Sequence, residues 1–299
     1  MEELIKSPLN YTGGKFKLLP QILPLFPKDI DNFLDMFGGG ANVTVNVKAK
    51  KVYYNDIESH VCGLLRYMYD NSCDSILNEL DKIIDYFGLS NTSIHGNIYP
   101  KEGNKGLAPY NKENYLRLRG EYNSHINNPI LFFTTLIYAF NNQIRYNSKG
   151  AFNMPVNKSD LNATLRKRII KFVERLHQID IEFLNEDFEN ISLNRWGQND
   201  FVYCDPPYLL TLASYNERDG WNEKKERILY DRLDRFNHQG MKFALSNVIE
   251  SKGQTNQILL EWSKKYNIIE INSNYNNCSY QKKEENKKEK TREILVLNY

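Results

Sequence analysis

Short apolar runs alternate with amphipathic stretches toward both ends of this 299-residue chain. Short runs rich in Val, Ile, Phe and Tyr are typical of buried strands, and apolar positions three or four residues apart are typical of helices. The expected strands are residues 31–36, 51–54, 181–184, 201–204, 242–245, 268–271 and 292–297. The expected helices include residues 41–49, 223–237 and 254–266. This alternation predicts an α/β fold with a mostly parallel, doubly wound sheet, which binds ligands beyond the carboxyl ends of its strands.

The middle of the chain has a different pattern. It is helix-like to about residue 87, rich in Asn and Gly through residue 109, and helix-like again to about residue 140. A chain of this length can form a full α/β core with one inserted subdomain. We therefore expect residues 1–59 and 179–299 to form one domain and residues 60–178 to form a helical insert.

Charge is distributed unevenly, although the formal net charge is only +2. Residues 112–175 hold 11 Lys or Arg against 4 Asp or Glu, whereas the remainder of the chain holds 28 against 33. A basic segment in an otherwise slightly acidic chain indicates a phosphate-binding face, and the alternative is a solvated helix face at residues 166–175. A lysine-rich run at residues 282–290 is expected to be a solvated loop between the last two strands, with a phosphate contact as the alternative.

Cysteine usage and the apolar stretches argue against zinc, secretion and membrane insertion. None of the four cysteines forms a C-x-x-C pair or has a His at metal spacing, which also favours a reducing compartment. The N-terminus lacks the basic and apolar regions of a signal peptide, and the apolar stretch at residues 131–140 is too short to cross a bilayer. We expect a cytoplasmic protein with no metal and no membrane partner.

The tetrapeptide Asp205-Pro206-Pro207-Tyr208 ends the apolar run 201–204 and is the most specific chemical signal in the chain. Its residues suit methyl transfer to an exocyclic amino nitrogen, whose lone pair is delocalised into a ring. The Asp205 carboxylate and the Pro206 carbonyl can accept the two amino hydrogens, because successive prolines hold the backbone extended. Tyr208 offers a ring on which a planar base can stack. The alternative is an ordinary turn at the end of a strand.

A glycine-rich turn after the first expected strand predicts a nucleotide-like cofactor. The spacing of Gly38 and Gly40 lacks the third small residue that a dinucleotide requires, because Val43 occupies that position. Asp56, at the end of the next strand, can accept both hydroxyls of a ribose, and its alternative role is a helix N-cap.

Other residues are candidates for the same cofactor. Tyr11 can face an adenine or a sulfonium, and Lys15 can pair with the carboxylate of a methionine group. The alternative is that their segment is an ordinary loop. Asp187 and Phe188 follow a strand and can hold an adenine, or they form a surface turn with a buried ring.

These residues together resemble the Dam family of DNA adenine-N6 methyltransferases, also called the D12 class. The segments that carry the resemblance cover nearly the whole chain: residues 7–15, 34–40, 54–56, 140–155, 205–208, 243–247 and 291–295. The resemblance implies a seven-stranded Rossmann-like methyltransferase sheet with a small helical target-recognition domain, and S-adenosyl-L-methionine as cofactor. It implies that Tyr11, Lys15, Asp56 and Asp205, with the loop at Phe37, contact this cofactor. It also implies that Asp205, Pro206 and Tyr208 hold a flipped-out adenine.

Residues 140–155 are similar to the segment that reads DNA in this family. Arg145 falls where the family places an arginine on a guanine edge. The candidate DNA-binding residues are Asn10, Asn141, Arg145, Asn147, Lys149 and Pro155. Asn10 stands where relatives that act on GATC have a lysine, and Gln143 stands where an apolar residue is usual, so GATC is not implied. The stretch from Asp205 through Tyr215 and on to Ser246-Asn247 is more similar to FokI-like modification methyltransferases of type IIS restriction systems.

The sequence thus predicts site-specific methylation of adenine N6 in double-stranded DNA, as the modification component of a restriction-modification system with a cognate endonuclease as a candidate partner. The alternatives are an orphan regulatory methyltransferase, N-methylation of RNA adenine or of a protein glutamine, a DNA-binding module without turnover, and a nicotinamide-dependent enzyme.

Overall fold

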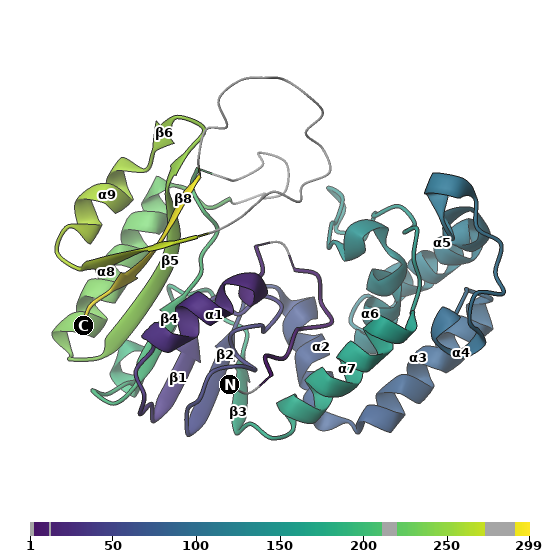
Figure 1. The fold of residues 1–299 in the computed structure, drawn as a ribbon, viewed down its shortest axis with the longest axis horizontal. Helices are drawn as coiled ribbons and strands as arrows, with labels where there is room; N and C mark the ends of the chain where they lie inside the picture. Colours follow the sequence, from purple (N-terminus) through teal and green to yellow (C-terminus); the bar gives the residue numbers. More distant parts are fainter. Residues whose placement is uncertain (1–2, 12, 211–219, 273–290) are drawn as a thin grey trace. The chain divides into compact units, whose positions relative to one another are not determined.

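The computed structural model describes residues 3–11, 13–210, 220–272 and 291–299 (Figure 1). It divides into two compact units. The first unit comprises Met1–Gly14, Gly39–Asn46 and Glu58–Asn185. The second unit comprises Lys15–Gly38, Val47–Ile57 and Glu186–Tyr299. Three predicted features lie outside the described residues: the lysine-rich run 282–290, Cys278 and Thr12.

The second unit is built on a mainly parallel sheet. Its strands are β1 (Asn32–Asp35), β2 (Lys51–Asn55), β4 (Phe201–Cys204), β5 (Lys242–Ser251), β6 (Gln254–Thr255), β7 (Asn267–Ile271) and β8 (Arg292–Leu297). They lie in the order β2-β1-β4-β5-β8-β7, with β6 beside β5. The first four are parallel, and β8 runs antiparallel to both of its neighbours. The predicted α/β class with a mostly parallel sheet is therefore confirmed.

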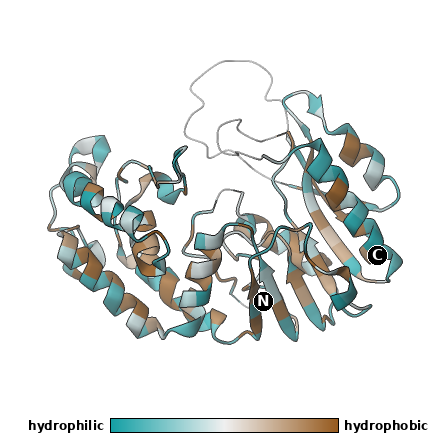
Figure 2. Ribbon diagram, turned by 180° about the vertical axis from the view of Figure 1, so that it is seen from behind, coloured by the Kyte–Doolittle hydropathy of each residue, from teal (hydrophilic) through white to brown (hydrophobic). Residues whose placement is uncertain are grey.

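The central strands of this unit are apolar because they are buried. All four residues of β4 are buried, as are three of the four in β1. Helices α8 (Glu223–His238) and α9 (Gln257–Ser263) pack on β5. The segment before β1 forms three short helical elements: η1 (Lys15–Leu18), α1 (Leu19–Ile22) and η2 (Leu23–Leu25). Figure 2 shows brown, apolar stretches along the strands and alternating teal and brown residues along the helices, as expected for amphipathic helices.

The first unit is helical. Its main elements are α2 (Ser59–Asp70), α3 (Cys73–Phe87), α4 (Thr92–His95), α5 (Ala108–Ser124), α6 (Pro129–Tyr138), α7 (Ala163–Leu176) and one strand, β3 (Ile181–Leu184). Helix α6 is its core, because eight of its ten residues are buried and it contacts α2, α3 and α5. Asn128 begins α6 by accepting hydrogen bonds from the backbone N–H groups of Ile130 and Leu131, both at 3.1 Å.

Each of the seven expected strands is present, but the helix predicted at residues 41–49 is wrong. Residues 42–46 form turns, residues 47–49 have no regular structure, and Ala41 has a positive φ of 60°. Asn46 and Asn42 bond instead to an extended segment near the N-terminus: Asn46 Oδ1 accepts from Ile5 N at 2.8 Å and Asn42 Oδ1 accepts from Ser7 N at 3.0 Å. Side-chain bonds of this kind compete with helix formation, and the β-branched residues around them weaken it further.

Candidate functional site

Three parallel strands of the second unit end together at one edge of the sheet. Asp35, near the end of β1, pairs in register with Tyr54 in β2 and with Tyr203 in β4. The residues that follow these strands therefore lie at the same edge. They include four of the predicted site residues: Phe37, Gly38, Asp56 and Asp205.

Four charged or hydroxyl side chains form what we call the Asp205 cluster: Lys15, Asp205, Tyr208 and Glu293. Lys15 Nζ lies 2.8 Å from Asp205 Oδ1 and 3.7 Å from a Glu293 oxygen. The Tyr208 hydroxyl donates to Asp205 Oδ1 at 2.8 Å and lies 3.1 Å from Glu293 Oε1. The Lys15 ammonium also lies 4.9 Å from the centroid of the Tyr208 ring, a cation–π contact.

The Asp205 cluster is largely buried and holds one basic and two acidic side chains. Lys15 is 4% exposed and Glu293 is 1% exposed, while Asp205 keeps 17% of its side chain accessible. Burial raises the pKa of Asp205, the Lys15 ammonium and the Tyr208 hydroxyl oppose this rise, and the Glu293 charge adds to it. Burial raises the pKa of Tyr208 well above its usual value, so its hydroxyl stays protonated and donates.

The two oxygens of Asp205 have different surroundings. Lys15 and Tyr208 both bind Oδ1, and no donor among the described residues binds Oδ2. Pro206 is buried and Pro207 is exposed. The arrangement fixes one carboxylate oxygen and leaves the other as a hydrogen-bond acceptor directly before two prolines.

The glycine turn after β1 is held against β2. A side chain on Gly38 would lie 2.3 Å from the Tyr54 ring, so only glycine fits there. The Gly38 N–H donates to Asn55 O at 2.7 Å. Asn55 then bonds to the backbone of Glu186 in both directions, accepting at 3.0 Å and donating at 3.1 Å. Asp56 follows Asn55 in the chain and is buried. The network around Asn55 therefore holds Asp56, the residue predicted to bind a ribose, beside the Gly38 turn.

An aromatic group lies next to this turn. The rings of Phe37, Phe188 and Trp221 lie pairwise 5.4, 5.5 and 5.7 Å apart. Asp187 accepts from Glu189 N at 3.0 Å and lies 3.9 Å from Lys225 Nζ. The prediction included Phe37 and Phe188 but missed Trp221, which lies far from them in sequence and precedes α8 without a motif to mark it.

Two further predicted cofactor residues, Tyr11 and Gly40, lie in the first unit. Side-chain atoms added to Gly39 or Gly40 would approach the Tyr11 side chain to 2.9 and 3.1 Å. The Gly14 N–H donates to Tyr11 O at 3.1 Å, which closes the predicted N-terminal glycine turn. Tyr11 therefore packs directly on the glycine loop of residues 39–40.

The candidate DNA-reading segment forms a hairpin, residues 139–156, in the first unit. Isolated bridges join Ala139 to Val156 and Tyr146 to Phe152. The Asn147 side chain accepts from Lys149 N at 2.9 Å and Ala151 N at 3.1 Å, which builds the tight tip on which Lys149 is exposed. This tip depends on interactions within five residues.

The remaining predicted DNA-binding residues lie at the base of the hairpin. Asn10 Nδ2 donates to Asn141 O at 3.0 Å, so the structure brings these two residues together. Asn141 is exposed in a left-handed conformation, with φ 53°, which Asn tolerates better than most residues. The carbonyl of exposed Pro155 accepts from Phe140 N at 2.8 Å.

Arg145 is held by a residue of the opposite side of the hairpin. Its Nε donates to Asn153 Oδ1 at 2.7 Å and its Nη2 donates to Asn153 O at 2.9 Å. These two bonds use one edge of the guanidinium, so the outer edge, made by Nη1 and the second hydrogen of Nη2, still points two donors in parallel. That is the geometry with which an arginine binds the O6 and N7 atoms of guanine.

Helix α5 anchors the hairpin. Asn123 bonds to Phe152 in both directions, at 2.8 and 3.1 Å. Tyr115 Oη and Arg119 Nη1 donate to Met154 O at 2.9 and 2.8 Å. A short, polar hairpin is thus fixed to a long helix.

Part of the positive charge in residues 112–175 has partners inside the first unit. Arg166 pairs with Asp81, Lys171 lies 2.7 Å from Glu3, and Arg175 Nε donates to Val45 O at 2.9 Å. These three basic residues of α7 therefore interact with other parts of the first unit. In the hairpin, by contrast, Lys149 is exposed.

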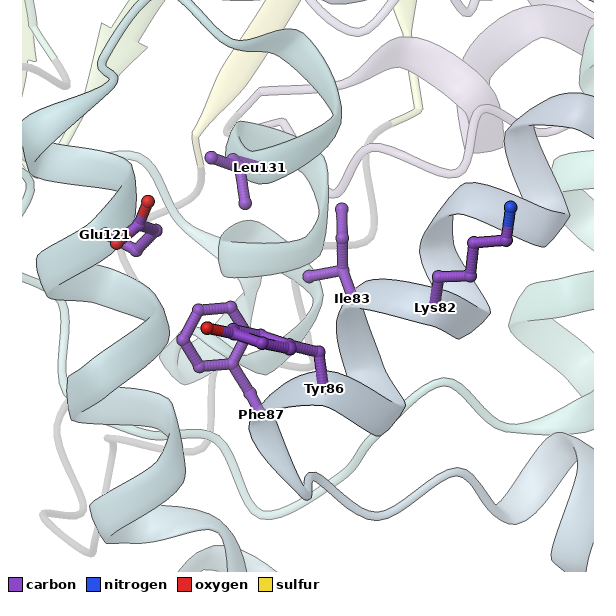
Figure 3. A pocket seen from close by; sticks show the side chains of 6 residues that line it. All are labelled: Lys82, Ile83, Tyr86, Phe87, Glu121 and Leu131. Carbon is purple, nitrogen blue, oxygen red and sulfur yellow. The ribbon is translucent and has the colours of Figure 1, made fainter.

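A hollow of about 430 Å³ lies among α3, α5 and α6 (Figure 3). Its lining residues are Lys82, Ile83, Tyr86, Phe87, Glu121 and Leu131. None of them is a predicted site residue. Within the described ranges, no cluster of three metal-ligating side chains occurs. No described helix is long and apolar enough to cross a membrane.

A mainly parallel sheet with a glycine turn after β1 and Asp-Pro-Pro-Tyr after β4 is typical of α/β enzymes that bind their ligands at the carboxyl ends of the strands. Comparison with known families identifies the class: the chain belongs to the D12 class N6 adenine-specific DNA methyltransferases, whose family model matches residues 11–277. The predicted family is therefore confirmed, and the family implies a methyl donor.

Individual relatives agree with this membership. The chain is 39% identical to the type II methyltransferase M.FokI of Planomicrobium okeanokoites and 38% identical to the modification methylase StsI of Streptococcus sanguinis. These alignments cover 99% and 100% of the chain but 43% of each relative. A DNA adenine methylase of Salmonella typhi is 25% identical over 70% of the chain and 66% of its own length. The FokI-like pattern thus matches more of the chain than the Dam pattern.

Proposed function

We propose that this chain transfers a methyl group from S-adenosyl-L-methionine to the N6 amino group of an adenine in double-stranded DNA. The observation that carries the proposal is the geometry of Asp205. One carboxylate oxygen is fixed by Lys15 and Tyr208, and the other faces no donor among the described residues.

The two oxygens after β4 suit an amino group. Asp205 Oδ2 accepts one N6 hydrogen and the Pro206 carbonyl accepts the other. These bonds draw the nitrogen lone pair out of the ring, which makes the amino nitrogen a better nucleophile. A charged acceptor gives the stronger of the two bonds, and burial strengthens both because water is excluded.

The second unit also offers a fit for the cofactor. In the proposal, Asp56 accepts the ribose hydroxyls and the Phe37–Phe188–Trp221 group with Asp187 holds the adenine ring. The Gly38 turn lets the backbone approach the cofactor closely. When bound, S-adenosylmethionine supplies an electrophilic methyl group on a sulfonium. The Asp205 cluster has one more negative than positive group, so it attracts a cation of this kind.

The hairpin suits recognition of duplex DNA. Arg145 presents a pair of parallel donors for a guanine edge, and Lys149 at the tip is free to approach a phosphate. A base inside a duplex cannot reach a buried acceptor, so the target adenine must leave the stack. In this proposal residues 60–178 read DNA, and residues 1–59 and 179–299 carry the chemistry.

The similarity to M.FokI and StsI supports a role in modification within a restriction-modification system, with a cognate endonuclease as partner and a cytoplasmic location. The chain spans less than half the length of these two relatives. Its own recognition site and partner must therefore be measured on this chain.

The direct test is to express the chain in a bacterial strain that lacks adenine methylation and to map modified bases by single-molecule sequencing. The expected result is N6-methyladenine at one sequence, which differs from GATC because Asn10 and Gln143 depart from the GATC pattern. A chain carrying Asp205→Ala is the matched control and should leave the DNA unmodified. Methyl groups on cytosine, or methylation that persists in the control, would contradict the proposal.

A further inference from the structure

Glu293 is a buried carboxylate in a strand whose last four residues are apolar. It is the second residue of β8, where it pairs in register with Val248 of β5, and it is followed by four buried apolar residues. Its side chain is 1% exposed. A carboxylate is rarely buried to this extent without partners, because burial of an uncompensated charge costs several kcal/mol.

Glu293 contacts both of the donors that bind Asp205. Its Oε1 lies 3.1 Å from the Tyr208 hydroxyl and 3.7 Å from Lys15 Nζ. Lys15 and Tyr208 both reach Asp205 Oδ1 at 2.8 Å. Glu293 therefore touches both groups that fix one oxygen of Asp205.

We propose that Glu293 is a positioning residue, which holds Lys15 and Tyr208 on Oδ1 of Asp205 and thereby keeps Oδ2 available for the amino group of the target base. This inference rests on the proposed methyl transfer and assigns a role to a residue outside the Asp-Pro-Pro-Tyr motif.

A second carboxylate, that of Glu293, restricts where the Lys15 ammonium can lie beside Asp205. Lys15 is a flexible point charge with three donors, and beside a single buried carboxylate it can bind both oxygens at once. A second negative group on the side of Oδ1 draws the ammonium toward that side. The Tyr208 hydroxyl is oriented in the same way, because it lies between two carboxylate oxygens. Without Glu293, Lys15 can move across to Oδ2 and compete with the substrate.

Glu293 also affects the acidity of Asp205. The groups that face Asp205 are Lys15 and Tyr208, which lower its pKa, and Glu293, which raises it. Tyr203 and Cys204 lie at the end of β4, and burial raises the pKa of each well above its usual value, so both stay uncharged. Asp35, which pairs in register with Tyr203, is a further carboxyl at this end of the sheet. Removal of the Glu293 charge therefore lowers the pKa of Asp205. The repulsion that raises this pKa is lost, and Lys15 then pairs with Asp205 without a competing carboxylate.

The test compares Glu293→Gln with wild type, using the full chain and duplex DNA that contains the mapped site. The expected result is a fall in kcat of about 10- to 100-fold, as is usual when a residue that orients a reactive group is removed. KM for DNA should change little, because Glu293 touches no DNA in the proposal. The acid limb of the pH–rate profile should move to lower pH, because Asp205 then ionises more readily.

Two further variants make the test specific. Glu250→Gln is the matched control, because Glu250 lies in β5 and pairs with exposed Arg292 at 3.1 Å; it removes the same charge and should leave kcat and the pH profile unchanged. Glu293→Asp keeps the charge, so its acid limb should stay at the wild-type pH while kcat falls less than in Glu293→Gln. If Glu293→Gln does not fold, Glu293→Asp is compared with wild type directly. Its shorter side chain draws the carboxylate away from Tyr208 and Lys15, so a lower kcat supports the inference and a wild-type kcat contradicts it.

The outcomes separate the two proposals. If wild type methylates adenine and Glu293→Gln matches it in kcat and in its acid limb, the positioning role is wrong and the proposed function stands. A lower kcat with an unshifted acid limb would indicate a purely structural role and would also contradict the inference. If wild type itself transfers no methyl group to adenine, the proposed function has failed.

Discussion

The Asp205 cluster and the hairpin at residues 139–156 both depend on polar side chains, but they are built in opposite ways. The cluster joins residues from the N-terminal segment, the end of β4 and the start of β8, and its members are largely buried. In the hairpin, Arg145 bonds to Asn153 eight residues away and Asn147 bonds to backbone groups within four residues. Most of these hairpin residues remain partly or fully exposed.

This difference separates chemistry from recognition. A buried cluster excludes water, so each hydrogen bond and charge within it has a large effect, and loss of one member leaves others unpaired. An exposed hairpin can change its contacting side chains at little cost to the fold. We expect substitutions in the cluster to affect catalysis and stability, and substitutions in the hairpin to affect the choice of DNA sequence.

The largest effect is expected for Asp205→Ala. This change removes the charged acceptor for the amino group, so the methylation rate should fall by about 10³-fold or more, the scale of losing a main electrostatic contact to the reacting group. Single-turnover transfer of labelled methyl groups measures the rate, and a gel-shift assay should show duplex binding close to wild type. Transfer at a rate near wild type would contradict the mechanism.

Lys15→Met should have the next largest effect, on stability. It leaves two buried carboxylates without their counter-ion, which costs about 3–5 kcal/mol of unfolding free energy at pH 8. Without the ammonium, the pKa of Asp205 in the folded state rises further above its unfolded value, because burial and the Glu293 charge raise it and Lys15 no longer opposes them. The folded state then binds more protons, so the variant regains stability as the pH falls and loses it as the pH rises through the folded pKa.

Urea unfolding at pH 5 and pH 8 measures this trend. The control is Lys50→Met, since Lys50 is 81% exposed and its pair with Asp31 lies at the surface; little change is expected there. A stability loss that is the same at both pH values would indicate lost packing instead of uncompensated charge.

Arg145→Ala should change recognition without changing the fold. Loss of a bidentate contact to guanine should reduce discrimination by about 1–3 kcal/mol at one base pair of the site. Binding to a panel of duplexes with single substitutions measures the loss, with exposed Arg227→Ala in α8 as a charge-matched control. An equal loss of affinity for every duplex would show that Arg145 binds a phosphate instead.

Asn153→Ala should give the smallest effect. It removes the side-chain acceptor for Arg145 Nε but keeps the backbone acceptor for Nη2. One lost hydrogen bond of this kind should weaken specific binding by about 0.5–1.5 kcal/mol. Titration with specific and unrelated duplexes checks this, because affinity for unrelated DNA should stay at the wild-type value. In an Arg145→Ala background the same change should have no further effect on specificity.

The sequence alone predicted the features that depend on local pattern. The apolar runs located the strands, because a strand buried on both faces is continuously apolar. The Gly38 turn and the Asp-Pro-Pro-Tyr turn followed from backbone restrictions of Gly and Pro. The helix expected at residues 41–49 was wrong because Asn42 and Asn46 bond to the segment at Ile5 and Ser7, which no local pattern reveals.

The tertiary structure decided which distant residues share a site. In the sequence, Glu293 is one of two adjacent charged residues before an apolar run, and its segment carries the family resemblance without marking a role for this side chain. Trp221 is an isolated aromatic residue before a helix. The register of β8 against β5 buries Glu293 beside Lys15 and Tyr208, and the packing around Phe37 and Phe188 places Trp221. Sequence determined the chemical groups because they follow from residue type and spacing; only the folded sheet determined their partners, since strand order and register join segments that the chain keeps far apart.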